Sequence, residues 1–255
     1  MKTTLLKALA TLCAAALLLP ATVQAAPSDP SVNPKALAAL KRMSDTLAAA
    51  KAFTFKSSSI FEVPAKTGQF VTLFSNAEVA LDRPDKLRAN MVGEAPHFDF
   101  FYDGKTVAAF APHTKVYSLA KAPPTIDAML PDLEQETGIR FVTAPLLLSN
   151  PFRVMTRGLT HAVVVGPSMV HGTVCEHLAF RSPGVNWEIW IEKSARSLPR
   201  RLAVTFTDRP NFPRTLVEFS NWNLHPWLGA GDFVFHKPAK AAEIPFRSVL
   251  KSAGR

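Results

Sequence analysis

Three side chains that can bind a metal ion lie close together in one segment of the chain. These are His171, Cys175 and His177, in a stretch whose alternation predicts a strand. Cys175 and His177 are two positions apart, so on a strand they project from one face, where a thiolate and an imidazole could hold zinc or copper. His171 could add a third ligand. A usable site needs three or four ligands, and the sequence shows no obvious residue for the fourth. The competing interpretation is a buried thiol beside a hydrogen-bonded histidine, and we predict neither a metal ion nor a cofactor.

The remaining polar residues do not form a recognisable catalytic pattern. The chain has no Gly-x-Ser-x-Gly elbow and no glycine-rich phosphate loop. His97, Asp99 and His113 fall near the ends of predicted hairpins, and no carboxylate pair stands out as an acid and base couple. Asp103 precedes Gly104, which is typical of a turn. We therefore expect a protein that is not an enzyme.

The largest apolar surface is predicted in three consecutive strands, at 186–192, 198–206 and 215–222. In the first, Trp187, Ile189 and Ile191 share one face, which we expect to be the buried, concave one. Trp190 lies on the other face between two glutamates. Either a loop or helix covers it, or it marks a ligand or partner surface. We predict that Trp190 lies on the convex side and is a candidate contact for a surface partner.

The first 25 residues predict a secretory signal peptide. A basic start is followed by an apolar run that is too short for a transmembrane helix, and small residues stand at Val23 and Ala25. A lipoprotein signal does not fit, because Leu12 rather than a small residue precedes Cys13. Residues 26–33 read as a linker, and no later segment is apolar enough to span a membrane. Cys175 remains alone after cleavage, so no internal disulfide is expected.

The charge of the chain argues against one class of partner. The formal net charge is +9, but the basic residues are scattered and form no run of the kind that binds nucleic acid. We therefore expect no nucleic-acid partner. Transient contact with an anionic membrane surface is one interpretation of the excess positive charge, and a contribution to ordinary solubility is the other.

The order of the predicted elements indicates one mainly β (α+β) domain over residues 34–236. A helix is expected from Pro34 to about residue 51, then six strands between 53 and 119. Two helical stretches follow at 125–136 and 145–158, the first of which Pro131 could divide into two pieces. Five more strands run to Trp222, 233–235 could add a short one, and 237–255 reads as a loose tail. An antiparallel sheet of about eleven strands must curl, which predicts a strongly curved half-barrel with helices covering its concave face.

The concave face of such a sheet is expected to be both core and cavity wall. Eighteen phenylalanines against two tyrosines give the chain an apolar bias suited to a lipophilic ligand. The competing interpretation is that these side chains fill the core. The candidate cavity residues are Phe55, Phe70, Phe74, Phe98, Phe100, Tyr102, Leu147, Phe152, Trp187, Ile189, Ile191, Leu202 and Val204.

Several motifs resemble known families. The turn and strand at 83–88, the Asp-Gly hairpin at 102–106 and the strand at 187–191 with its Leu-Pro-Arg return at 198–200 resemble the lipoprotein carriers LolA and LolB. The segment 172–180, the Trp-Glu-Ile-Trp-Ile strand and 198–202 are similar to domain-of-unknown-function family 2092, predicted periplasmic proteins of Gram-negative bacteria. The resemblance covers roughly residues 30–222. It implies a periplasmic, LolA/LolB-like half-barrel of eleven strands with a helical lid and a lipophilic cavity, and it brings no catalytic residues.

Together these features predict a periplasmic binding or carrier protein for a lipid or acyl chain. The alternative is a structural or envelope-assembly factor that acts through its surface, with the cavity filled by its own lid. An envelope protein is a further candidate partner in either case. An uncharacterised enzyme is the third interpretation.

Overall fold

The computed structural model describes residues 31–94 and 97–246. The signal peptide predicted at 1–25, most of the linker and the last nine residues of the predicted tail lie outside the described residues. All described residues belong to one compact unit that begins at Ser31.

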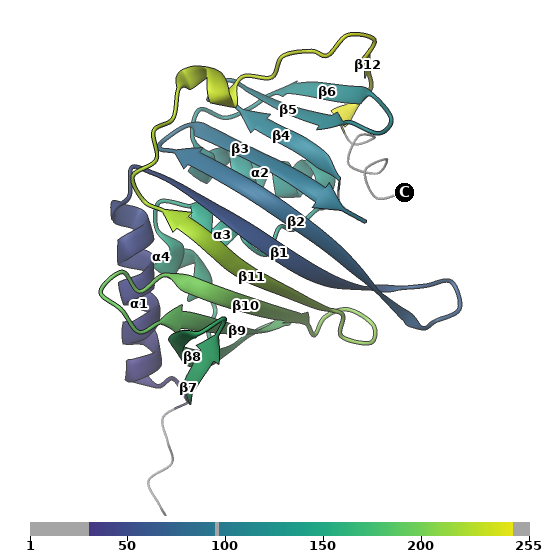
Figure 1. Cartoon of the computed structure of the whole chain (residues 1–255). Helices are drawn as coiled ribbons and strands as arrows, with labels where there is room; N and C mark the ends of the chain where they lie inside the picture. Colours follow the sequence, from purple (N-terminus) through teal and green to yellow (C-terminus); the bar gives the residue numbers. More distant parts are fainter. Residues whose placement is uncertain (1–30, 95–96, 247–255) are drawn as a thin grey trace, which may run out of the picture. The chain divides into compact units, whose positions relative to one another are not determined.

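A single sheet of twelve strands forms the body of this unit (Figure 1). Its spatial order is β12-β6-β5-β4-β3-β2-β1-β11-β10-β9-β8-β7, so β1 joins the two halves by pairing with β11. All neighbours are antiparallel except β12, which runs parallel to β6. The first six strands are β1 (Ala52–Pro64), β2 (Phe70–Asp82), β3 (Lys86–Gly93), β4 (Phe98–Tyr102), β5 (Thr106–Ala111) and β6 (Val116–Lys121). The others are β7 (His161–Val170), β8 (Thr173–Ser182), β9 (Val185–Glu192), β10 (Pro199–Phe206), β11 (Arg214–Asn223) and β12 (Ala242–Glu243).

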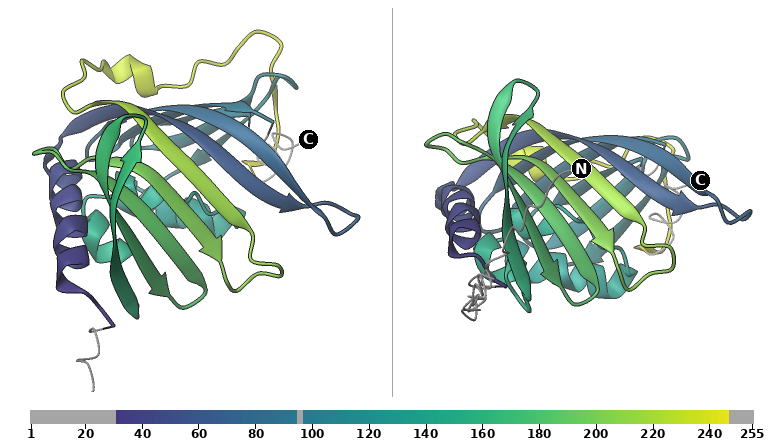
Figure 2. Two further views of the ribbon diagram at one scale, coloured as in Figure 1. Left: turned by 60° about the horizontal axis from the view of Figure 1, so that its bottom comes forward. Right: turned by 90° about the horizontal axis from the view of Figure 1, so that it is seen from below.

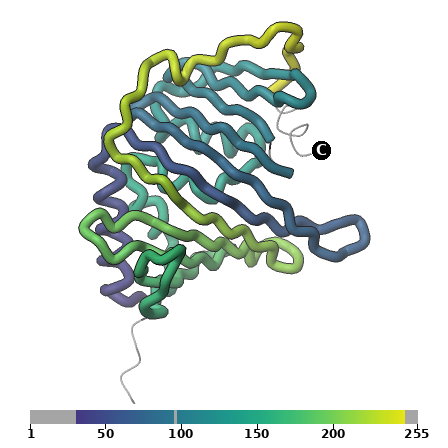
Figure 3. Tube along the Cα trace, viewed as in Figure 1, coloured from purple at the N-terminus to yellow at the C-terminus, as the bar shows by residue number. Residues whose placement is uncertain are grey.

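The sheet curls strongly and stays open, with the helices on its concave side (Figure 2). The edge strands β12 and β7 do not pair with each other. The hairpin that joins β1 to β2 extends beyond the ends of its neighbours (Figure 3). The predicted class, a mainly β half-barrel with a helical cover, is confirmed. The two-residue strand β12 was not predicted.

Four helices of the described chain cover the concave face. Helix α1 (Pro34–Ala49) begins as predicted, with the side chain of Asn33 accepting a hydrogen bond from the Lys35 N–H at 2.9 Å. Helix α2 (Ile126–Thr137) is continuous through Pro131, which is exposed, so the predicted division does not occur. The second helical stretch does divide, into α3 (Ala144–Leu147) and α4 (Pro151–Met155).

The end of the described chain packs against the sheet. Instead of a strand at 233–235, a 3-10 helix (η1, Ala230–Phe233) leads the chain across the convex face. The ring of Phe235 packs there against Phe101, Phe110 and Tyr117. The chain then pairs with β6, as the Ala242 N–H bonds to the Lys115 carbonyl at 3.0 Å. Residues 237–246 of the predicted tail therefore lie beside this aromatic patch and along the edge of β6, and the looseness of the tail stays a prediction.

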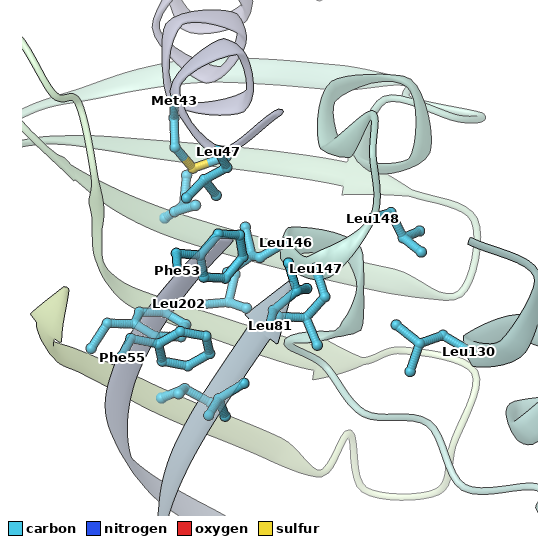
Figure 4. Packing of buried hydrophobic residues seen from close by; sticks show 14 of the residues in the cluster. Met43, Leu47, Phe53, Phe55, Leu81, Leu130, Leu146, Leu147, Leu148 and Leu202 are labelled. Atoms are coloured by element: carbon cyan, nitrogen blue, oxygen red, sulfur yellow. The ribbon is translucent and has the colours of Figure 1, made fainter. Parts of the chain in front are cut away.

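The core fills the end of the half-barrel that is nearest α1. Phe53 and Phe55 of β1 pack with Trp222 of β11, whose ring stacks on Phe55 at a centroid distance of 4.5 Å. Leu146 and Leu147 of α3 lie against this cluster from the concave side of the sheet (Figure 4). Among the described residues, no helix is long and apolar enough to cross a membrane.

Candidate ligand cavity

We call α2, α3, α4 and the segments that join them, residues 126–155, the lid. Beyond the packed end, a cavity of about 570 Å³ remains between the sheet and this lid. Its floor comes from β1, β2, β3, β4 and β11, and its roof from α2, α3 and the segment 138–143 that joins them. The volume lies within the range of about 300–1,000 Å³ that is usual for small-molecule sites. The half-barrel is thus filled at one end and hollow at the other.

Small side chains on the floor explain the hollow. Along β1, the concave face changes from Phe53 and Phe55 to Ser57 and Ser59. In the register with β2, Ser59 lies opposite Ser75 and Ser57 opposite Ala77. Serine and alanine at these positions leave a volume that larger side chains would occupy. The walls beyond them are apolar, with Phe61, Leu73, Met91, Phe98 and Phe100.

The roof is apolar as well. Leu130 and Leu133 project from α2, and Phe141 and Leu147 follow in the connecting segment and α3. Helix α2 turns one stripe to the sheet, because Ile126, Met129, Leu130 and Leu133 are its buried residues. The helix ends at Gly138, whose φ of +71° allows the left-handed turn into the connecting segment.

Arg83, in the turn between β2 and β3, holds the lid segment to the sheet. Its Nη1 donates to the carbonyl of Leu147 at 2.9 Å and its Nη2 to that of Leu148 at 2.9 Å. Nη2 also lies 3.4 Å from the carbonyl of Leu47 at the end of α1. Burial lowers the pKa of the Arg83 guanidinium, and the charge of Asp127 acts in the opposite direction. One half-buried cation thus caps two helices at their carboxyl ends.

Two further hydrogen-bonded contacts tie the helices together. Asp127 at the start of α2 accepts the Ser149 N–H at 2.8 Å and also the Ser149 hydroxyl. Ser44 of α1 is buried, and its oxygen accepts the Phe152 N–H of α4 at 2.9 Å. The lid is therefore joined to α1, to the sheet and to itself by a small number of polar contacts.

Charged side chains line only part of the cavity. They are Arg140 of the connecting segment and Arg209 of the turn between β10 and β11, while Glu62 of β1 reaches the rim with its side chain on the convex face. Arg140 pairs with Glu134 at 2.8 Å. The Arg209 guanidinium lies 4.3 Å from the centre of the Phe206 ring. Glu62 accepts the backbone N–H of Arg214 at 3.1 Å.

Of the candidate residues from the sequence, Phe98, Phe100 and Leu147 lie on the cavity wall. A second group points to the concave side but is packed into the core nearer α1. It consists of Phe55, Tyr102, Phe152, Trp187, Ile189, Ile191, Leu202 and Val204. Periodicity identifies the face of a strand, but it does not say how far along the strand the helices fill the space.

Phe70 and Phe74 are placed differently from the prediction. The residues of β2 on the cavity wall are Leu73, Ser75, Ala77 and Val79, so the two phenylalanines lie on the opposite face, and Phe74 is 55% exposed. The segment Phe70-Val71-Thr72-Leu73-Phe74 carries apolar residues on both faces. The prediction placed the face with the larger side chains on the concave side, and that face is the convex one.

Several wall residues were not identified from the sequence. Ile139 and Phe141 lie in an irregular segment, where no period identifies an inward face. Phe206 and Val217 lie on strands whose alternation was recognised, and they could have been found by extending it to the strand ends. The small residues that create the hollow carry no hydrophobic signal at all.

Trp190 lies on the convex side, as predicted, in a small cluster with Val170, Cys175 and Ala203. Its ring stacks on His177 at 4.0 Å, and the Arg201 guanidinium lies 5.3 Å from its centre. Only 7% of the residue is exposed. His177 and Arg201 of its own sheet cover much of the ring, and the remaining edge lines a hollow of the convex face with Leu216.

The three metal-ligand candidates have separate partners. The Nε2 of His171 lies 2.7 Å from Glu218 and that of His177 lies 2.8 Å from Glu188. The Cys175 thiol donates to the carbonyl of Thr173 at 3.4 Å. Within the described residues, no three His, Cys, Asp or Glu side chains are arranged to hold a metal ion.

Solved structures with low sequence identity resemble this chain. An uncharacterized conserved protein from Thermus thermophilus is 12% identical, with a TM-score of 0.48 over 83% of this chain and 99% of its own. The Mycobacterium tuberculosis lipoprotein LppX is 12% identical, with a TM-score of 0.48 over 74% and 96%. A LolA superfamily protein from Nitrosomonas europaea is 10% identical, with a TM-score of 0.37 over 78% and 97%. A search of the curated proteins found no match.

The family of the chain follows from its sequence. The family model described as "Predicted periplasmic protein (DUF2092)" matches residues 36–247, which include the whole sheet and, apart from the first two residues of α1, all four helices of its concave face. The resemblance noted in the sequence is thereby confirmed, and the chain belongs to the DUF2092 family of predicted periplasmic proteins.

Proposed function

We propose that this protein binds a lipophilic molecule, such as a lipid or an acyl chain, in the cavity beneath its lid, and carries it in the periplasm without changing it chemically. The supporting observation is the cavity of about 570 Å³, whose wall is mainly apolar apart from a few hydroxyl groups of the floor. A space of this kind is unfavourable when filled with water, because its walls offer few hydrogen bonds. Burial of a methylene group there contributes about 0.8 kcal/mol, so an acyl chain is a suitable occupant.

The ligand contacts that we propose are the wall residues rather than the whole candidate set. Phe98, Phe100 and Leu147 are predicted to touch the ligand, together with Phe61 and Met91. The signal peptide predicted at 1–25 would deliver the protein to the periplasm, in agreement with the description of its family.

The alternative of a surface-acting assembly factor requires a cavity that the lid itself fills. The volume that remains under α2 and α3 favours the carrier over that alternative. An envelope protein could still receive the ligand from the carrier.

The proposal is tested by extracting protein purified from the periplasm with organic solvent and identifying released lipids by mass spectrometry. A lipid in near-stoichiometric amount is the expected result. The matched control is the variant Ala89→Leu, which places a larger side chain on the cavity floor and should carry much less lipid. Protein that is free of lipid and that binds none when lipids are added back would contradict the proposal.

A further inference from the structure

The charged groups of the cavity wall come from two elements that are far apart in the sequence. Arg140 lies in the segment after α2, on the lid side, and Arg209 lies in the turn between β10 and β11, on the sheet side. Both reach a cavity whose remaining wall is mainly apolar. An apolar space with cations at its edge matches a molecule that has an apolar chain and an anionic head.

Arg209 is held in place without an acidic partner. Its guanidinium lies over the Phe206 ring at 4.3 Å, and both residues line the cavity. Among the described residues, no carboxylate forms an ion pair with Arg209. The aromatic contact restrains the side chain while its N–H donors stay free for an anion.

Among the described residues, Arg140 and Glu62 are the other two charged residues at the cavity, and neither neutralises Arg209. Arg140 is already paired with Glu134, although both side chains are about half exposed and such a pair is easily exchanged. Glu62 reaches the rim of the cavity, but the alternation of β1 turns its carboxylate to the convex side, where it accepts the Arg214 N–H and lines a second hollow with Trp190. The wall therefore carries two guanidinium groups, and the Glu62 carboxylate at its rim is turned to the convex side.

The size of the cavity limits the ligand. A volume of about 570 Å³ lies within the range of about 300–1,000 Å³ of sites that hold one drug-sized molecule. This corresponds to one acyl chain with a small head and is too little for a phospholipid with two long chains.

We infer that the cavity selects an amphiphile with one acyl chain and an anionic head, carboxylate or phosphate, and that Arg209 is its principal head contact with Arg140 in support. This inference rests on the proposed function and specifies its ligand class.

The test measures the affinities of amphiphiles that share one chain and differ in the head, by isothermal titration below their critical micelle concentrations. The probes are tetradecanoate, tetradecyl phosphate, tetradecyl maltoside and tetradecyltrimethylammonium. The proteins are the full mature chain, Arg209→Gln, Arg140→Gln and the control Arg181→Gln, which changes an exposed arginine of β8 away from the cavity.

We expect at least one of the two anionic probes to bind at least about fivefold more tightly than the maltoside. This ratio of dissociation constants corresponds to roughly 1 kcal/mol in binding free energy. Arg209→Gln should remove most of that preference, Arg140→Gln a smaller part, and Arg181→Gln none. Raising the ionic strength should reduce the preference as well. Preference for tetradecanoate alone or for tetradecyl phosphate alone would identify the head as carboxylate or as phosphate.

Two failures can be told apart. If the neutral or cationic probe binds as tightly as the anionic ones and Arg209→Gln has no selective effect, the head-group inference is overturned while the carrier proposal stands. If none of the four probes binds, the carrier proposal fails with it.

Discussion

Arg83 donates a hydrogen bond to the backbone carbonyl of Leu147, at 2.9 Å, and thereby joins the β2–β3 turn to the roof of the cavity. The same guanidinium binds the carbonyls of Leu148 and Leu47. Three carbonyls from two helices converge on one side chain because its five donors lie in a rigid plane. This half-buried cation is thus one of the contacts that set the position of the lid above the sheet.

Replacing Arg83 by lysine should loosen the lid. A lysine ammonium cannot reproduce the planar fork, so at least one carbonyl loses its partner, and we expect a loss of about 1–3 kcal/mol in the free energy of unfolding. Hydrogen exchange should become faster in residues 144–155 than in β1 and β2. The matched control is Arg88→Lys, an exposed arginine on the convex face near Phe101, which should change neither measurement. Equal exchange in the lid of both variants would contradict this role of Arg83.

Enlarging a floor residue should weaken ligand binding without unfolding the protein. Ala89 of β3 lines the cavity, so Ala89→Leu fills part of it, and we expect the affinity for tetradecanoate to fall at least tenfold. The unfolding free energy should change by no more than about 1 kcal/mol, because the added methylenes enter free space. The control is Ala80→Leu in β2, whose side chain lies on the other face. An affinity that Ala89→Leu leaves intact would place the ligand elsewhere.

Glu192 should make the stability of the protein depend on pH. It is 3% exposed, and burial alone would raise its pKa. The hydrogen bond from Ser194 and the hydrogen bonds and charge of Arg200 outweigh burial and lower the pKa below its ordinary value of 4.5. A carboxylate with a lowered folded-state pKa stabilises the fold above its unfolded pKa, and this contribution disappears as the pH falls through the folded value.

The measurement is urea unfolding of the protein and of Glu192→Gln over a range of pH. At neutral pH we expect the variant to be less stable by about 2–4 kcal/mol, because it leaves Arg200 without its anion. The difference should shrink below about pH 4.5 as Glu192 of the parent protein takes up a proton. A difference that is constant down to acid pH would show that the carboxylate charge is not the cause.

Cys175 should be unreactive in the folded protein. It is fully buried on the convex side beside Trp190, and burial raises the pKa of its thiol, which reduces the fraction present as thiolate. A chromogenic disulfide reagent should therefore react only at the rate of unfolding at neutral pH, and rapidly in denaturant. Fast reaction of the folded protein would show that Cys175 is accessible, and would reopen the metal-ligand interpretation.

The sequence predicted the architecture more fully than the site. Alternation in Trp187-Glu188-Ile189-Trp190-Ile191 placed the first, third and fifth residues inside and Trp190 outside, and the structure agrees. A period of two is a strong constraint where one face is polar. On β2 both faces are apolar at Phe70–Phe74, and there the assignment failed.

The cavity itself could not be read from the sequence. It exists because Ser57, Ser59 and Ala77 are too small to fill the space that Phe53 and Phe55 fill further along the same sheet. Their smallness has meaning only once α2 and α3 are known to lie above them. The same holds for Arg83, whose partners are backbone carbonyls that no residue pattern reveals.

The central claim is that a lipophilic ligand lies between the concave face of the sheet and the lid. It is tested most directly with a photoreactive fatty acid that carries a diazirine near the middle of its chain, followed by peptide mapping of the cross-links. We predict cross-links in β1 to β4 and in residues 130–147, suppressed in Ala89→Leu and retained in Ala80→Leu. Cross-links confined to the convex face around Trp190, or the same pattern in both variants, would contradict the account.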